Sequence, residues 1–470
     1  MSIVEELEAA GELLSPAVRQ ALGRLEARLL LVEEENAEMS RRLGMNSRNS
    51  SKPPSSDPPG TLRPKSKRSG RTRGAQPGHP GAGRKRTPPD QIVVHRPQRC
   101  HGCGWDLSAV GAQPKRRRTQ VLELPPRALL LVEHEMACVA CPSCGVRTWA
   151  SAPAEVQGHR FGVRLAALVS LLVGRGHLSR RQVHEVLRQM SPAAPSLGSI
   201  ERMLQQSRHA LGPAYGEIRQ QIRQSQRVGV DETPWSRRGK RLWGWIATTP
   251  AASLFLISRS RAARVFSHLL GRRYEGIVHS DRWSAYKRQE TRRRQLCWAH
   301  LRRDFTELRE RDHARAADFG VRGLAICQRL FHHWHLFRAG ILTRVQLQQK
   351  LLSARRRMSS LIEAMLQSDL RRVAGMGKSL HALEPALWNF AEHEGVEPTN
   401  NPAEQGLRKL VLWRKKSFGS DSAAGLKMVE RLLSVLESCR LQQRNAFDFL
   451  CDSIRAHRTG SLPPLLFAPH

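Results

Sequence analysis

Three acidic side chains stand where the sequence could build a site for phosphodiester chemistry. Asp231 follows an apolar run in VGVDETPW, Asp281 ends such a run in GIVHSDRWSAY, and Glu404 lies in PTNNPAEQGLRK. Chemistry on a phosphodiester uses clustered carboxylates that hold two divalent cations about 3.5 to 4 Å apart, one at the attacking oxygen and one at the leaving oxygen. Hard oxygen ligands favour Mg²⁺ or Mn²⁺. We therefore predict that these three acids bind two magnesium or manganese ions.

The elements expected around these acids are strands for two of them and a helix for the third. The runs before Asp231 and Asp281 are short and rich in β-branched residues, which predicts buried strands that end at the carboxylates. Residues 401–404 (NPAE) fit the first positions of a helix from its N-cap. Two alternatives stay open: Glu404 could serve only as part of a capping box, and Glu397, just before the helix, is a rival third ligand.

The sequence from residue 226 onward predicts the sheet that carries the two aspartates. Strand-like segments, QRVGVDET, RLWGWIATT and ASLFLISRS, are followed by a helical segment, RAARVFSHLLG, and by two more strands, YEGIVHSDRW and QLCWAH. Three strands, a helix and further strands indicate the mixed sheet of a ribonuclease-H-like domain, in which neighbouring strands hold both aspartates close together. Apolar residues at helical spacing then predict an all-helical insertion over 304–396.

The overall charge favours a nucleic acid as the partner. The chain has 470 residues, a net charge of +36 and a pI near 11.3, and a polyanion is the expected partner of such a protein. Beside Glu404, the candidate contacts to DNA phosphates are Arg408, Arg414, Lys415 and Lys416. The acidic start and the lack of an apolar run near the roughly 18 residues of a membrane span predict a cytoplasmic protein that is not associated with a membrane.

A heptad repeat near the N-terminus predicts a coiled coil. A lone asparagine at an a position fixes the register of a parallel dimer, so we expect a homodimer or a higher oligomer through residues 1–45. A helix docked on the same chain is the alternative. The a positions are Leu22, Leu29, Asn36 and Leu43, and the d positions are Leu25, Val32 and Met39.

A basic linker and a cysteine cluster follow the heptads. Residues 46–92 hold too few apolar side chains to bury a core, and their cations suit DNA phosphates. Two Cys-x2-Cys pairs then predict a structural Zn²⁺ site with four thiolates, and the runs QVLEL and ALLLVEHEM are expected to form a hairpin that joins the pairs. Cys138 is the spare thiol. The linker candidates are Lys65, Lys67, Arg68, Arg71 and Arg73, and the zinc ligands are Cys100, Cys103, Cys141 and Cys144.

Several of these motifs, taken together and in order, resemble a known family. PTNNPAEQGLR, VLWRKKSFGS, GVDETPW, SDRWSAY and CWAHLRRDF, with GAQPGHPG and NSSKPPSSD upstream, are similar to the large transposase of the insertion sequence 66 family. The resemblance implies a DDE transposase of a bacterial insertion sequence, with Asp231, Asp281 and Glu404 as its triad. It would bind terminal inverted repeats, cleave DNA and join the 3′-OH ends to target DNA, with small accessory proteins of the same element as further partners. Gln405 and Ala75 depart from the usual Arg and Gly.

The expected architecture is a multidomain α+β protein. Its parts are a coiled-coil helix (1–45), a disordered basic linker (46–92), a zinc-binding domain (93–155), a helical region with a candidate helix-turn-helix (156–222), a ribonuclease-H-like core in two parts (223–303 and 397–455), the helical insertion (304–396) and a tail (456–470).

Two rival functions remain on sequence grounds. A non-catalytic DNA-binding regulator would use only the zipper and the zinc module. A ribonuclease that acts on RNA in hybrids would use the same fold, but such enzymes need a fourth acid, and Glu232 is expected on the opposite strand face from Asp231.

Overall fold

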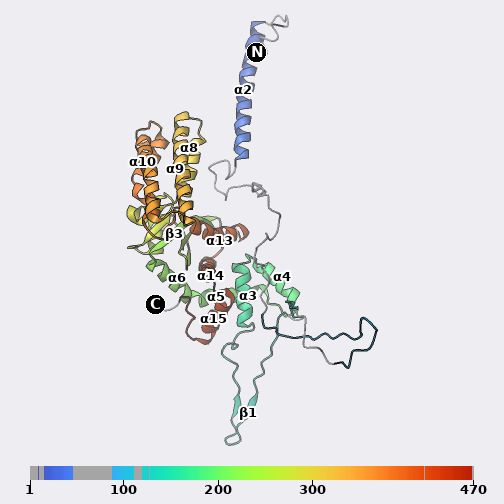
Figure 1. Cartoon of the computed structure of the whole chain (residues 1–470). Helices are drawn as coiled ribbons and strands as arrows, with labels where there is room; N and C mark the ends of the chain where they lie inside the picture. The colour runs from blue at the N-terminus through green and yellow to red at the C-terminus, as the bar shows by residue number, and fades with distance from the viewer. Residues whose placement is uncertain are drawn as a thin grey trace. The chain divides into compact units, whose positions relative to one another are not determined.

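The structure of the chain is a computed structural model that describes residues 9, 15–45, 87–110, 119–125, 128–417 and 419–467. It is a multidomain α+β protein with a mixed sheet and many helices (Figure 1), as the sequence predicts. By contacts within the chain, one compact unit comprises Met1–Thr61, His134–Val186 and Pro195–His470, and the other comprises Leu62–Glu133 and Leu187–Ala194. Among the described helices, none combines the length and apolar character that crossing a membrane requires.

The heptad segment forms one long helix, α2 (Pro16–Gly44). Ser15 caps it, because its Oγ accepts a hydrogen bond from the Val18 amide at 3.3 Å. Heptad side chains of α2 are solvent-exposed in the single chain, for example Leu25 at 64% and Leu43 at 80%. The predicted linker cations Lys65, Lys67, Arg68, Arg71 and Arg73 lie outside the described residues.

The cysteine region differs from the predicted hairpin. Residues 120–124 and 128–136 were predicted to pair, but neither segment contains a strand. Residues 126–127, between them, lie outside the described residues. Leu122 and Leu130 are 84% and 87% exposed, so no packed layer stabilises strands there. The hairpin that forms is shorter: β1 (Cys138–Ala140) pairs antiparallel with β2 (Arg147–Trp149).

Each Cys-x2-Cys pair forms a tight turn of the same kind. The Gly104 amide donates to the Cys100 carbonyl at 2.9 Å, and the Gly145 amide donates to the Cys141 carbonyl at 2.8 Å. Both glycines have positive φ angles, 75° and 72°, which a residue with a Cβ adopts only at a cost. Backbone hydrogen bonds within each turn lower the pKa of the first thiol, Cys100 or Cys141.

Helices form the region before the sheet. They are α3 (Val163–Gly174), α4 (Arg180–Met190), α5 (Leu197–Ala210) and α6 (Gly212–Gln224). α3 packs against α5 and against the C-terminal helix α15 (Ala446–Thr459). Where α3 meets α5, the buried hydroxyls of Ser170 and Ser207 share a hydrogen bond of 2.8 Å.

The central sheet has five strands in the order β5-β4-β3-β6-β7. β3 (Arg227–Arg237), β4 (Lys240–Thr248) and β5 (Ser253–Ser258) form an antiparallel meander. After α7 (Ala263–Leu270), strand β6 (Ile277–Ser280) pairs parallel with β3, and after two 3-10 turns, η2 (Ser284–Arg288) and η3 (Thr291–Arg293), β7 (Arg294–Leu296) pairs parallel with β6. The strands and the helix predicted from residue 226 onward are confirmed.

A helical subdomain follows β7 and has its own apolar core. Its elements are α8 (Trp298–Arg309), α9 (Ala314–Arg338), α10 (Arg344–Leu366), α11 (Arg371–His381), η4 (Glu384–Leu387) and α12 (Asn389–Glu392). Phe305, Leu330 and Met358 are among its fully buried side chains. α9 lies so close to α8 that a Cβ on Gly320 would be 2.6 Å from the Phe305 carbonyl oxygen and 2.8 Å from the Arg309 Cα.

The start and the end of this helical subdomain are held together. The Trp298 amide, at the start of α8, donates a hydrogen bond of 2.9 Å to the Pro398 carbonyl. The Arg344 guanidinium donates to the carbonyls of Phe390, Ala391 and His393 at 3.2 to 3.3 Å. The chain therefore leaves the subdomain beside the point where it entered.

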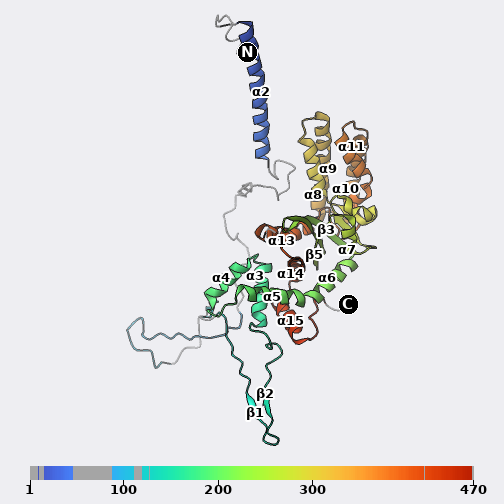
Figure 2. The same ribbon diagram turned by 180° about the vertical axis from the view of Figure 1, so that it is seen from behind.

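Two C-terminal helices cover the sheet. α13 (Asn401–Ser417) packs on β3 and β4, and α14 (Ala423–Leu441) packs on β5. Figures 1 and 2 both draw α13 beside β3. Gly229 permits this close approach, because a Cβ there would lie 2.6 Å from Asn400 Oδ1 and 3.3 Å from the Ala403 Cβ.

Candidate active site and metal-binding residues

The pairing of β3 with β6 sets Asp231 beside Asp281. Gly229 is paired with His279 in this parallel ladder, and two residues further along each chain come the two aspartates. Residues two apart point to the same face, and neighbouring strands lie about 4.8 Å apart. Asp231 is half-buried, and its pKa is raised well above the ordinary value, first by loss of solvation and then by the negative charges of Glu232, Asp281 and Glu404.

α13 brings Glu404 to the same neighbourhood. The buried Asn400 side chain, just before the helix, donates a hydrogen bond of 2.8 Å to the Val230 carbonyl. The first turn of α13 thus lies over the face of β3 that carries Asp231, and the charge of Glu404 contributes to the raised pKa of that aspartate. The structure therefore brings the three predicted acids near enough for the charges of Asp281 and Glu404 to act on Asp231. The ligand atoms of these three described residues do not all lie within 4.8 Å of one another.

The two rival acids have other partners. Glu397 forms an ion pair of 2.6 Å with Arg338 of α9. Glu232 forms an ion pair of 2.7 Å with Arg261 and accepts a hydrogen bond from the Tyr286 hydroxyl. Burial, and next the charge of Asp281, raise the pKa of Glu232. Each of these two acids is therefore already paired with an arginine.

Asp281 is held by neighbours that sequence reasoning missed. The Trp283 amide donates to its Oδ1 at 2.9 Å. The fully buried Arg294 donates to the Asp281 carbonyl at 2.5 Å and to the Ser280 hydroxyl at 2.9 Å, and burial lowers the pKa of this guanidinium to about 10. Nothing in RRRQL distinguished Arg294 from its neighbours, because its role depends on burial.

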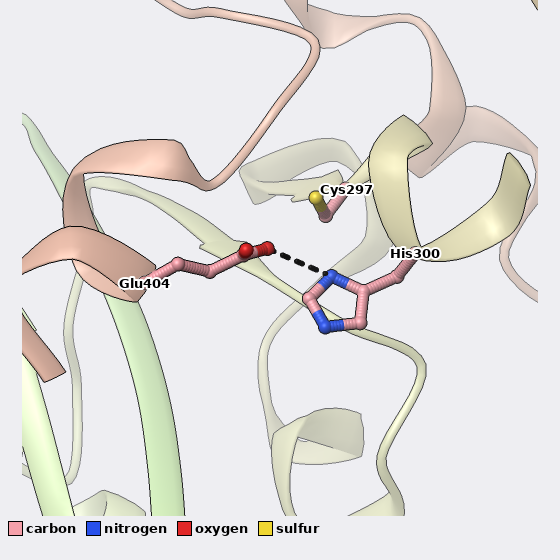
Figure 3. Close-up of side chains that lie close together, drawn as sticks. All are labelled: Cys297, His300 and Glu404. Carbon is pink, nitrogen blue, oxygen red and sulfur yellow. Dashed lines mark ion pairs between the residues drawn. The ribbon is translucent and has the colours of Figure 1, made fainter. Parts of the chain in front are cut away.

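A second group of ligand atoms surrounds Glu404. Cys297, His300 and Glu404 each offer one ligand atom, and these atoms all lie within 4.8 Å of one another. Figure 3 shows His300, at the start of α8, facing the carboxylate of Glu404 of α13, with the sulfur of Cys297 nearby. The Glu404 Oε1 is 3.3 Å from His300 Nδ1 and 3.5 Å from the Arg303 guanidinium. The Cys-x2-His spacing in CWAH was the available signal, and sequence reasoning missed it.

Comparison with known proteins gives the family. Residues 158–428 match the family model described as Transposase IS66 family. The chain belongs to this transposase family. Residues 2–85 also match a family of unknown function, DUF6444.

Curated relatives carry no functional name. Over 269 residues the chain is 26% identical to the uncharacterized protein y4qI of Sinorhizobium fredii, and the match covers 50% of this chain and 49% of that protein. Two further uncharacterized proteins of the same organism, y4hP and y4jD, are 24% and 23% identical over 77% and 79% of this chain, covering 71% and 77% of their own lengths. The chain thus spans about half the length of the first of these relatives.

The cations that follow the third acid in this IS66-family chain have unequal environments. Arg408, Lys415 and Lys416 are exposed on α13. Arg414 is partly buried, and its guanidinium donates to the Pro234 carbonyl and, at 3.3 Å, to the Thr233 hydroxyl. Arg414, predicted as a phosphate contact, therefore holds α13 against β3.

Acid should destabilise the fold through His279. Burial lowers the pKa of this histidine from 6.5 to about 4, and a backbone hydrogen bond with Thr399 offsets the effect only in part. Between these values the unfolded chain binds a proton that the native chain does not, so stability falls as pH falls through that window. We expect acidification from about pH 7 to about pH 5 to cost the natural protein about 2 kcal/mol more than His279→Gln. Urea unfolding at both pH values measures the difference, and equal losses would contradict the assignment.

Proposed function

We propose that the chain is a DDE transposase of a bacterial insertion sequence, which binds terminal inverted repeats, cleaves DNA and joins the 3′-OH ends to target DNA. Membership of the IS66 transposase family supports the general role. The single observation that carries the catalytic assignment is that the charges of Asp281 and Glu404 lie near enough to Asp231 to raise its pKa, because negative charges gathered at one carboxylate favour a bound cation. The net charge of +36 supports a polyanionic substrate.

The three acids suit hard divalent cations. Their donors are carboxylate oxygens, which Mg²⁺ and Mn²⁺ prefer, and the Glu404 Oε1 is buried without a hydrogen-bond partner. Two such ions supply activation of water or a 3′-OH and stabilisation of the leaving oxygen when bound. Asp231, Asp281 and Glu404 would hold them.

The rest of the chain positions these ligands. The Trp283 amide fixes the Asp281 carboxylate, and Arg294 holds the backbone at the end of β6. Asn400 and Gly229 set the first turn of α13, which carries Glu404, against the strand that carries Asp231. Preorganised ligands of this kind lower the cost of reaching the reactive geometry. The strand order, with the first acid on the central strand and the second after its parallel neighbour, supports a ribonuclease-H-like core.

DNA would be bound by exposed cations of several segments. Arg408, Lys415 and Lys416 are exposed on α13, the helix that carries Glu404, and the linker cations predicted from sequence would add salt-dependent affinity. The helices α3 to α5 are the candidate region for reading the element ends. The protein would act in the bacterial cytoplasm on nucleoid DNA, with accessory proteins of the same element as further partners.

A homodimer through α2 is part of the proposal. α2 exposes apolar side chains at its heptad positions, and Asn36 is exposed at one a position. This pattern suits a parallel coiled coil. Sedimentation of the full chain tests this: a dimer that Leu29→Lys converts to monomer is expected, and a monomeric natural protein refutes it.

The structural Zn²⁺ site of Cys100, Cys103, Cys141 and Cys144 also stays a proposal. Each pair has the tight turn, closed by a backbone hydrogen bond, that suits two thiolates bound to one metal. Zinc content of the purified chain, with and without Cys141→Ser, tests it; undiminished zinc in the variant contradicts it.

The decisive test is a nicking assay on a duplex that contains an element end. A transposase cuts the strand at the end only when Mg²⁺ or Mn²⁺ is added. The DNA-binding regulator would shift the duplex in a gel but never cut it. Preference for an RNA/DNA hybrid over the DNA duplex would instead favour the ribonuclease.

A further inference from the structure

The group beside the three acids contains a sulfur and a nitrogen donor as well as a carboxylate. Cys297 lies at the N-cap position of α8, His300 lies one turn into that helix, and Glu404 lies in the first turn of α13. Their ligand atoms all lie within 4.8 Å of one another. Thiolate, imidazole and carboxylate together are the donor set of zinc-type ions, whereas magnesium avoids sulfur.

Two of these donor atoms lack a hydrogen bond. His300 Nδ1 and Glu404 Oε1 are 3.3 Å apart, yet their geometry forms no hydrogen bond, and both atoms are buried without another hydrogen-bond partner. Buried polar atoms without partners are costly. A cation between them would satisfy both at once.

Backbone amides surround the sulfur of Cys297. Its Sγ accepts a hydrogen bond from the Asn400 amide at 3.2 Å, and the amides of Ala299 and His300 also point at it. Burial nevertheless raises the pKa of this thiol to about 11, so a bound cation must displace the thiol proton. The Arg303 guanidinium also opposes a cation, because it lies 3.5 Å from Glu404 Oε1 and is partly exposed.

We propose that Cys297, His300 and Glu404 form a binding site for a single thiophilic divalent cation of the Zn²⁺ type. Four-coordinate zinc holds its ligand atoms roughly 3.3 to 3.8 Å apart, so the side chains must approach one another by about 1 Å. Binding forms a metal–sulfur bond and releases the Cys297 thiol proton to solvent. Arg303 gives up its contact with Glu404, and the fourth position stays open to water.

The site shares Glu404 with the proposed magnesium site. This consequence rests on the proposed function: a zinc ion that holds Glu404 at α8 removes it from Asp231 and Asp281, so zinc should inhibit Mg²⁺-dependent cleavage. Added zinc is expected to lower the cleavage rate of the natural protein at least roughly tenfold relative to its rate without added zinc. The same comparison for Cys297→Ser should show a smaller reduction.

The binding itself is tested without DNA, so that its failure and the failure of the transposase proposal are distinguishable. Co²⁺ replaces zinc as a spectroscopic probe in the full-length chain. The natural protein is expected to bind one more Co²⁺ than Cys297→Ser, measured by equilibrium dialysis, and to show additional thiolate-to-cobalt absorption. Glu404→Gln should weaken this additional binding at least roughly tenfold.

Two further variants keep the test sharp. Cys327→Ser removes a buried thiol of α9 that is not part of the group, so it should keep the full cobalt signal. Arg303→Gln removes the competing cation and should tighten binding at least roughly threefold, which loss of folding cannot mimic. Equal cobalt binding by the natural protein and Cys297→Ser, or unchanged affinity in Arg303→Gln, would overturn the proposal.

Discussion

Replacing Asp281 by asparagine is expected to lower the rate of metal-dependent DNA cleavage by roughly a thousandfold. The change keeps the shape of the side chain but removes a ligand charge, and loss of several kcal/mol of metal-mediated stabilisation corresponds to that factor. In the variant, the side-chain oxygen at position 281 can still accept the hydrogen bond from the Trp283 amide. The fold and the affinity for DNA should therefore change little. Nicking rates at saturating protein, together with gel-shift affinities, measure both quantities.

Glu397→Gln is the matched control for this prediction. Glu397 carries the same kind of charge near the start of α13, but its carboxylate pairs with Arg338 at 2.6 Å, away from the three acids. Its cleavage rate should stay within about threefold of the natural protein, as is usual for a partly exposed ion pair. Cleavage by Asp281→Asn at the natural rate would remove Asp281 from the site, and a large loss in Glu397→Gln alone would reinstate Glu397 as the third ligand.

Gly320→Val should destabilise the helical subdomain by about 3 kcal/mol. The added side chain meets the backbone of α8, with its Cβ 2.6 Å from the Phe305 carbonyl oxygen and 2.8 Å from the Arg309 Cα. Backbone cannot rotate away as a side-chain end can, so α9 must move off α8. Urea unfolding followed by circular dichroism measures the loss.

Gly375→Ala in α11 controls for the general effect of replacing a helical glycine. An added Cβ there meets nothing within 4 Å, so the variant should gain about 0.5 to 1 kcal/mol from reduced backbone freedom. A Gly320→Val protein as stable as the natural one would mean that α8 and α9 do not pack as described.

The strands and their acids could be predicted from sequence because the signals are local. Apolar runs rich in β-branched residues end at Asp231 and Asp281, and the described strands end or pass there. The choice between Glu404 and Glu397 was not local, because it depends on Arg338, a residue of another helix. The predicted hairpin of residues 120–124 with 128–136 was wrong because these apolar runs were read as strands although no layer buries them.

Contacts between distant segments explain what sequence reasoning missed. CWAH showed a cysteine and a histidine at a ligand spacing, but their carboxylate partner comes from α13, about a hundred residues later. Arg294 and Arg414 look like any other arginines of this basic chain. Only packing assigns one to the backbone of Asp281 and the other to the carbonyl of Pro234.

The joined entry and exit of the helical subdomain have a consequence for engineering. Trp298 bonds to Pro398, and Arg344 binds the carbonyls that precede the exit. The subdomain is therefore attached to the sheet at one end, where the chain both enters and leaves it. The α10–α11 turn lies at the other end of the subdomain, where the exposed Asp369 pairs with Arg315 at the start of α9. A fluorescent protein or affinity tag spliced into this turn would report on the molecule while leaving the register of Glu404 untouched.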